Sequence, residues 1–134
     1  MVNTLLQINS TLDKLIALTK EDIENIKAAK HDEVFKNTKP KEELAEEFYN
    51  LKNQLDRILA NRNMPIEEIF SKDEEVLFNQ FREKLQTFYE LHSKFSKFAL
   101  SVANFYNALY EQINPTQKVT YKERTFSSSL ELKV

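Results

Sequence analysis

The residues that most often carry chemistry in proteins are few in this chain and far apart. The only histidines are His31 and His92, and neither belongs to the His-Glu-X-X-His pattern with which a helix holds catalytic zinc. The sequence therefore predicts no metal site. His92 lies on the apolar face of a long helical pattern, which favours a half-buried histidine hydrogen-bonded to a neighbouring helix; a ligand or switch role is the alternative.

Carboxylates occur in short runs, such as Glu46-Glu47 and Asp73-Glu74-Glu75. Two carboxylates can act as general acid and base, but these runs lie near the predicted starts of helices, where the helix dipole and solvation account for them. Glycine and cysteine are absent from the chain. Their absence excludes glycine-dependent phosphate loops, disulfides, thiolate zinc sites and cysteine nucleophiles. We therefore expect no enzyme activity, no catalytic residue and no cofactor.

Composition and charge are typical of a water-soluble protein with a single helical domain. The chain has 134 residues, of which 30% are charged and 41% hydrophobic. The formal charge of −2 and the lack of a basic face argue against nucleic-acid binding. The N-terminus lacks a basic leader region, and no apolar run approaches the roughly 18 residues of a membrane helix. We expect a cytoplasmic protein that does not insert into membranes.

One uninterrupted helical pattern extends from Ser71 to Asn114. Ser71 and Glu74 have the spacing of a capping box, which predicts the start of the helix, and Pro115 predicts its end because proline lacks a backbone N–H. Apolar residues recur at alternating spacings of three and four along this span, as in helix-on-helix packing. This seam consists of Leu77, Phe81, Leu85, Phe88, His92, Phe95, Ala99, Val102, Tyr106, Leu109 and Ile113.

A second apolar line lies beside the seam and is made of Leu91, Phe98 and Phe105, at intervals of seven residues. One neighbouring helix cannot cover an apolar arc of this width. Either a third helix of the same bundle or a partner protein would explain the second line, and the sequence leaves both explanations open.

Two shorter helices are predicted before the long one. The first extends from the start of the chain to about Lys30. Its apolar face is Leu5, Ile8, Leu12, Leu15, Leu18, Ile23 and Ile26. We expect a break or kink between Lys30 and Pro40, and a second helix capped by Asn37 or Thr38, because the first turn of a helix tolerates proline. The second helix is predicted to end near Ala60. Its apolar face is Leu44, Phe48, Leu51, Leu55 and Ile58.

The connection to the long helix contains Pro65, which can open a one-turn helix. The apolar residues after it, Ile66, Ile69 and Phe70, are predicted to close this end of the bundle.

The chain after Pro115 mixes short apolar alternation with a serine run and matches no regular element. We therefore divide the protein into a helical bundle domain, residues 1–114, and a flexible C-terminal tail, residues 115–134. The predicted fold is all-α. It is an elongated antiparallel three-helix bundle, or helical hairpin coiled coil, with a long C-terminal helix.

Several features together resemble one known family. Lys41 precedes the leucines of the second predicted helix, and the stretch 101–109 reads Ser-Val-Ala-Asn-Phe-Tyr-Asn-Ala-Leu. Pro115 and Tyr121 follow in a short tail. With the order and lengths of its helices, most of the chain resembles the FlgN family of flagellar export chaperones. Two features depart from the family pattern: Pro40 lies where the family usually continues in helix, and the tail lacks glycine.

The resemblance implies a small cytoplasmic chaperone for hook–filament junction proteins. Such a chaperone covers the amphipathic C-terminal helical segment of its client, keeps the client soluble and export-competent, and releases it at the export apparatus. We predict that the client-binding surface combines the second apolar line with apolar residues of the tail. Its residues are Leu91, Phe98, Phe105, Val119, Tyr121 and Phe126.

Two alternatives to this prediction stay open. In the first, the protein is a self-associating coiled-coil scaffold or adaptor without chaperone activity, and the second apolar line joins the copies of a homodimer. In the second, the protein is an export chaperone of another secretion system, with the same mechanism and a different client.

Overall fold

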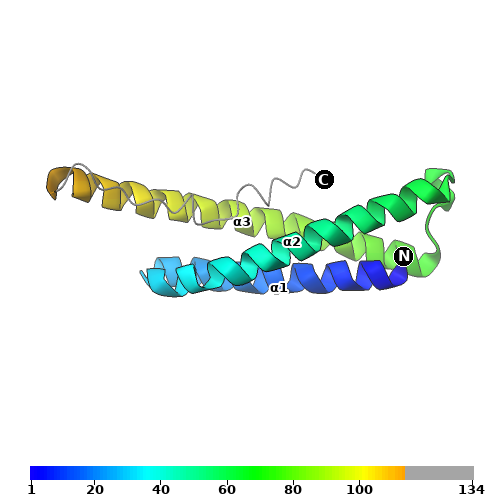
Figure 1. The fold of residues 1–134 in the computed structure, drawn as a ribbon, viewed down its shortest axis with the longest axis horizontal. Coiled ribbons are helices and arrows are strands. Elements are labelled where there is room, and N and C mark those ends of the chain that lie inside the picture. The colour runs from blue at the N-terminus through cyan, green and yellow to red at the C-terminus, as the bar shows by residue number, and fades with distance from the viewer. Residues whose placement is uncertain (114–134) are drawn as a thin grey trace.

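Three long helices and one short 3₁₀ turn follow one another along residues 1–113, the part of the chain that this computed structural model describes. They are α1 (Val2–Lys27), α2 (His31–Arg62), η1 (Ile66–Glu68) and α3 (Lys72–Ile113). Consecutive long helices are antiparallel, so α1 and α3 run in the same direction (Figure 1). The prediction of an elongated all-α three-helix bundle with a long C-terminal helix is confirmed. The predicted tail, residues 115–134, lies outside the described residues.

Apolar side chains of the three helices meet in two clusters along the bundle. The first core cluster is formed by Leu5, Ile8, Leu12, Leu15, Ala45, Phe48, Leu51, Leu55, Phe81, Leu85 and Phe88. The second core cluster is formed by Ile23, Ile26, Val34, Phe95, Ala99 and Ala103. Removing each large side chain from water stabilises the fold by roughly 1.5–3 kcal/mol. The predicted apolar faces therefore supply most of the core.

On α1, two polar residues are buried at core positions, and one leucine predicted for the core is not fully buried. Leu18 is only half-buried, whereas Thr19 and Asp22 are buried and continue the three-four spacing from Leu15 to Ile26. The Thr19 hydroxyl donates a hydrogen bond of 2.7 Å to the Leu15 carbonyl. The buried Thr19 hydroxyl therefore has a hydrogen-bond acceptor.

The predicted capping box at the start of α3 is present. The Ser71 N–H donates to Glu74 Oε1 at 2.9 Å, and the Glu74 N–H donates to Ser71 Oγ at 3.3 Å. The Arg62 guanidinium also donates one bond of 2.5 Å to each oxygen of the Glu74 carboxylate. These bonds hold the pKa of Glu74 down to about 2. Because the pair is bidentate, it ties the end of α2 to the start of α3.

α2 begins at His31 and contains Pro40 in its interior, so the prediction of a helix capped by Asn37 or Thr38 is wrong. The physical reason is that Asp22 of α1 binds side chains on both sides of the proline, namely Asn37 and Lys41. Pro40 itself is exposed, so the carbonyl that loses its helical partner lies on the solvent side, where water can bind it.

The break between the first two helices lies earlier than predicted, at residues 28–30. The Lys30 N–H donates to the Asn25 carbonyl at 2.8 Å, and the Ala29 N–H donates to the Ile26 carbonyl at 3.0 Å. This is the hydrogen-bond pattern of a Schellman motif, which needs a left-handed residue that is usually glycine. In this chain Ala29 takes that position, with a φ of 58°. The turn therefore carries the small strain of a Cβ in the left-handed region.

Candidate binding surface on the third helix

The last part of α3 exposes apolar side chains on a stretch without charge. No residue from Phe98 to Tyr110 is charged. Within this stretch Leu100 is 56% exposed, Phe105 is 61% exposed and Leu109 is 40% exposed. A surface helix normally opposes its apolar face with charged residues. This end of α3 therefore presents apolar surface that residues 1–113 leave open to solvent.

Among the described residues, α3 extends past the hairpin formed by α1 and α2 (Figure 1), so its last turns have no neighbouring helix. The hairpin turn reaches the level of Tyr106, whose ring meets His31 edge-on with 5.7 Å between ring centroids. Leu109, predicted as a seam residue of the core, lies beyond that level, and the prediction is wrong for this residue. Helical periodicity identifies the face on which a residue lies, but not the length of the neighbour that would cover it.

Four apolar residues share one face of this part of α3, within an arc of about 60° at 100° per residue. We call Phe98, Val102, Phe105 and Leu109 the α3 strip. The inner residues Phe98 and Val102 are half-buried against the second core cluster, whereas Phe105 and Leu109 are exposed. One end of the α3 strip thus packs against the core, and the other end is exposed to solvent.

The residues predicted to bind a client are placed differently from one another. Leu91 and Phe98 pack against the second core cluster, so both serve the fold as well as the surface. Phe105 is free of the core and belongs to the exposed end of the α3 strip. Val119, Tyr121 and Phe126 lie outside the described residues.

A charged pair is buried between the two core clusters. The Lys41 ammonium donates to Asp22 Oδ2 at 2.6 Å, and each side chain is only 2% exposed. The Asn37 amide donates to Asp22 Oδ1 at 2.8 Å, and Lys41 Nζ lies 4.2 Å from the centroid of the Phe95 ring. Burying two ions costs several kcal/mol each, and these contacts offset that cost. The network therefore joins all three long helices.

The burial of this pair was not predicted, although the sequence carries a signal for it. Asp22 lies seven residues after Leu15 and four before Ile26, and Lys41 lies seven residues before Phe48. Both therefore occupy buried positions of the helical pattern. A charged residue at such a position indicates a buried partner.

His92 lies near this network and is held in its neutral form. Its ring stacks between Phe88 and Phe95, with centroids 5.8 Å and 6.4 Å away. Burial and, to a smaller extent, the nearby Lys41 ammonium together lower the pKa of His92 to about 4. Burial also lowers the pKa of Lys41, and Asp22 opposes that shift. The half-buried position of His92 agrees with the predicted partial burial, whereas its predicted hydrogen bond to a neighbouring helix stays a prediction.

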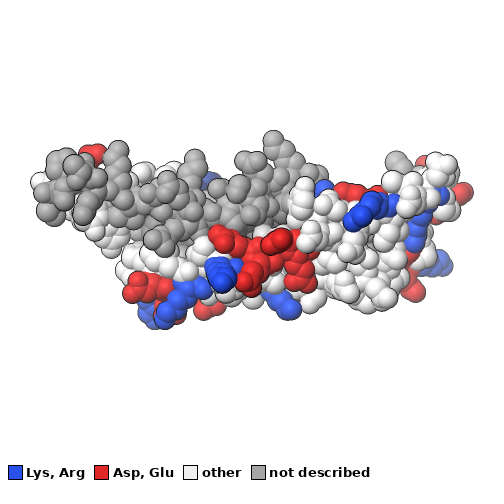
Figure 2. All heavy atoms as spheres, in the orientation of Figure 1, with Lys and Arg blue, Asp and Glu red and all other residues white. Residues whose placement is uncertain are grey.

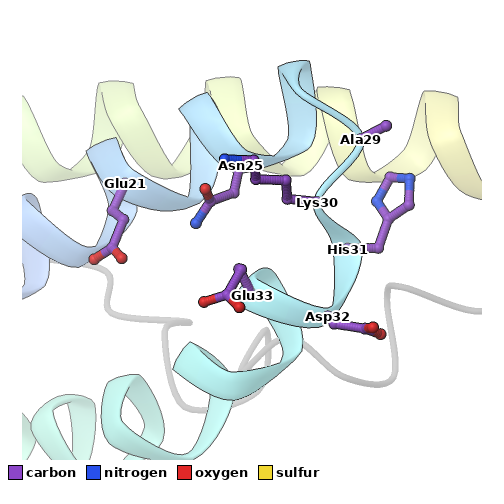
Figure 3. A pocket seen from close by; sticks show the side chains of 7 residues that line it. All are labelled: Glu21, Asn25, Ala29, Lys30, His31, Asp32 and Glu33. Carbon is purple, nitrogen blue, oxygen red and sulfur yellow. The ribbon is translucent and has the colours of Figure 1, made fainter.

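A shallow hollow at the α1–α2 turn is another surface feature that could hold a ligand. It is lined by Glu21, Asn25, Ala29, Lys30, His31, Asp32 and Glu33. Figure 3 shows the Glu21 and Glu33 carboxylates on the side of the hollow, whereas Asp32 and His31 point away from them. The acidic side chains are exposed, and no three His, Cys, Asp or Glu residues among the described ones are placed to hold a metal.

Comparison with protein-family models, curated proteins and solved structures finds no match to this chain. Along residues 1–113, no helix has the length and apolar character needed to cross a membrane.

Proposed function

We propose that this protein is a cytoplasmic export chaperone of the FlgN type. It binds the amphipathic C-terminal helix of a hook–filament junction protein and keeps that client soluble until it reaches the export apparatus. The observation that carries the proposal is the α3 strip, where Phe105 is 61% exposed on a stretch of helix without charge. The identity of the client rests on the resemblance to the FlgN family, through Lys41 and residues 101–109.

The shape of the α3 strip suits a helical ligand. Phe98 to Leu109 spans about 17 Å at 1.5 Å per residue, which is three helical turns. An amphipathic helix contacts such a surface through apolar residues at positions i, i+3 or i+4, and i+7. On the adjoining face of α3, Ala99 and Ala103 are buried in the second core cluster and hold the helix in place. The client helix would therefore meet a preformed surface.

A surface of this size also suits reversible binding. Three turns of helix provide a small contact area, and a small area gives moderate affinity unless several residues are strong anchors. An export chaperone must release its client, so moderate affinity is an advantage. In the proposal, Val119, Tyr121 and Phe126 add to the contact, and deletion of residues 115–134 should weaken binding.

The test compares two serine variants of equally exposed apolar residues. A peptide that copies the C-terminal helix of a hook–filament junction protein is titrated into the full-length protein, and the heat of binding is measured. Phe105→Ser should weaken binding at least about tenfold, because an exposed aromatic ring is a typical anchor. Leu100→Ser is the matched control, because Leu100 is 56% exposed but lies about 140° around α3 from Phe105. It should bind like the unmodified protein.

Both variants should melt like the unmodified protein, because neither side chain lies in a core cluster. Equal effects of the two substitutions would contradict the proposed surface. Absence of binding at high micromolar peptide, together with a stable dimer in sedimentation, would overturn the chaperone proposal in favour of the self-associating scaffold.

A further inference from the structure

Exposed lysines border one end of the α3 strip. Lys27, at the end of α1, places its ammonium 5.8 Å from the centroid of the Phe98 ring. Lys94 lies one helical turn before Phe98 on α3, and positions four apart share a face. Lys97 is adjacent in sequence, and all three lysines are exposed. Phe98 therefore lies between a lysine of α1 and lysines of α3.

The parallel packing of α1 and α3 extends this basic border. The Lys84 ammonium bonds Asp13 at 2.9 Å across a separation of 71 positions, and Lys27 and Phe98 have the same separation. Seven residues before Lys27 is Lys20, and it lies at the level of Leu91 by the same register. Lys20 is exposed as well. The border thus continues along the edge of α1.

Acidic residues balance these lysines only in part. From Leu91 to Tyr110, the only charged residues of α3 are Lys94 and Lys97. Glu24 lies 3.7 Å from Lys27, and the exposed Glu90 lies four residues before Lys94, so two carboxylates offset part of this positive charge. Acidic side chains gather instead over the middle of α2 (Figure 2), where Glu42, Glu43, Glu46 and Glu47 are exposed.

We propose that the α3 strip takes an amphipathic helix whose apolar face is bordered by acidic residues. The apolar residues of the partner would cover the uncharged stretch from Phe98 to Tyr110, and its Asp and Glu side chains would meet Lys27, Lys94 and Lys97. This inference rests on the proposed function, since it specifies the chemistry of the helix that the same surface binds. It adds a selection rule: among helices of equal apolarity, those with acidic borders bind and those with basic borders are rejected.

The expected size of this selection follows from the exposure of the lysines. An ion pair at the rim of an interface changes affinity by roughly twofold to fivefold, and mainly through the association rate. Three such pairs should favour an acidic-bordered helix by about tenfold or more over a neutral-bordered one at low ionic strength. Salt should reduce the preference, because the Debye length falls to about 10 Å at 0.1 M.

The test uses two synthetic helical peptides of about 18 residues with the same Leu and Phe positions at i, i+3, i+4 and i+7. One carries Glu and the other Lys along both borders of the apolar face. The full-length protein should bind the Glu-bordered peptide at least about tenfold more tightly at low salt. The triple variant Lys27→Glu, Lys94→Glu and Lys97→Glu should reverse this preference.

A second triple variant separates local from overall charge. Lys14→Glu, Lys39→Glu and Lys72→Glu change the net charge equally, at exposed positions away from the α3 strip. This control should still prefer the Glu-bordered peptide. If the unmodified protein binds both peptides equally, the acidic-border inference is overturned while the proposed helix-binding function stands. If it binds neither peptide, nor the junction-protein peptide, both are overturned.

Discussion

At the scale of single residues, the buried pair of Asp22 and Lys41 restricts how the first two helices can pack. Apolar seams with three-four spacing can slip by a heptad at little cost, because leucine then replaces leucine. A slip of α2 along α1 would instead separate Lys41 from Asp22 and leave two buried charges unpaired. Such a state costs several kcal/mol, so the pair acts against alternative registers of the bundle.

Removing either partner of this pair should therefore be costly, and removing both less so. We expect Asp22→Ala and Lys41→Met each to lower the free energy of unfolding by about 3 kcal/mol or more, since each leaves a charge of the pair without its counterion. The double variant should lose at least about 2 kcal/mol less than the sum of the single losses. Urea denaturation of the four proteins, followed by circular dichroism, measures this coupling.

An exposed pair on α2 provides the comparison. Lys52 and Asp56 are 3.2 Å apart, and the Asp56 side chain is 58% exposed. The same cycle at this pair should give a coupling of about 0.5 kcal/mol or less. If the Asp22–Lys41 coupling were equally small, the buried pair would not act as a lock on the register.

At the scale of the elements, Pro40 is the weakest point of α2. It lies inside the helix, where it removes one backbone hydrogen bond, and the contacts of Asp22 with Asn37 and Lys41 hold the helix together across it. A proline in a helix interior costs about 3 kcal/mol relative to alanine, although alanine also gains conformational freedom in the unfolded chain. Pro40→Ala should therefore raise the free energy of unfolding by about 1–2 kcal/mol, measured by urea denaturation.

Pro65→Ala is the matched control for this substitution. Pro65 precedes η1, and its carbonyl accepts a hydrogen bond of 2.9 Å from the Glu68 N–H, which alanine would keep. The control should be neutral or slightly destabilising, because it only adds freedom to the unfolded chain. If the Pro40→Ala protein is no more stable than the control, α2 accommodates its proline at no cost in the free energy of unfolding.

The elements also show which parts of the fold were predictable from the sequence. Periodicity predicted the apolar faces, since a residue's position on a helix depends only on local geometry. The start of α2 was missed because contacts from another helix, absent from any local pattern, outweigh the preference of Pro40. Asp22 and Lys41 were missed because isolated charges favour the surface. Leu109 was misplaced because its exposure depends on where the hairpin turn ends. Among the described residues of the predicted client-binding site, Phe105 is the one whose exposure best suits a binding role.

At the scale of the whole molecule, the bundle has one closed end and one open end. At the closed end, Arg62 joins Glu74 and Phe70 stacks on Phe78, with ring centroids 4.6 Å apart. At the open end, α3 passes the hairpin turn and exposes Phe105 and Leu109. The closed end can therefore stabilise the fold, whereas residues 1–113 leave the open end uncovered.

Acid should destabilise this molecule in two steps, each from a different residue. The pKa of His92 is about 4 in the fold, against 6.5 ordinarily, so the unfolded chain takes up that proton first as the pH falls. Its contribution to stability is complete above pH 6.5 and is lost between pH 6.5 and 4, by up to about 3 kcal/mol. The pKa of Glu74 is about 2, against 4.5, so its contribution is lost between pH 4.5 and 2.

Two substitutions should separate these steps, because the two groups lie in different parts of the bundle. Denaturant unfolding of His92→Gln should show a free energy that is nearly independent of pH between 6.5 and about 4.5, where the unmodified protein loses stability. Glu74→Gln should keep that loss and flatten only the more acidic step. An equal loss in the His92→Gln protein between pH 6.5 and 4.5 would mean that other groups take up the protons. The neutral ring stacked between Phe88 and Phe95 would then contribute to packing alone.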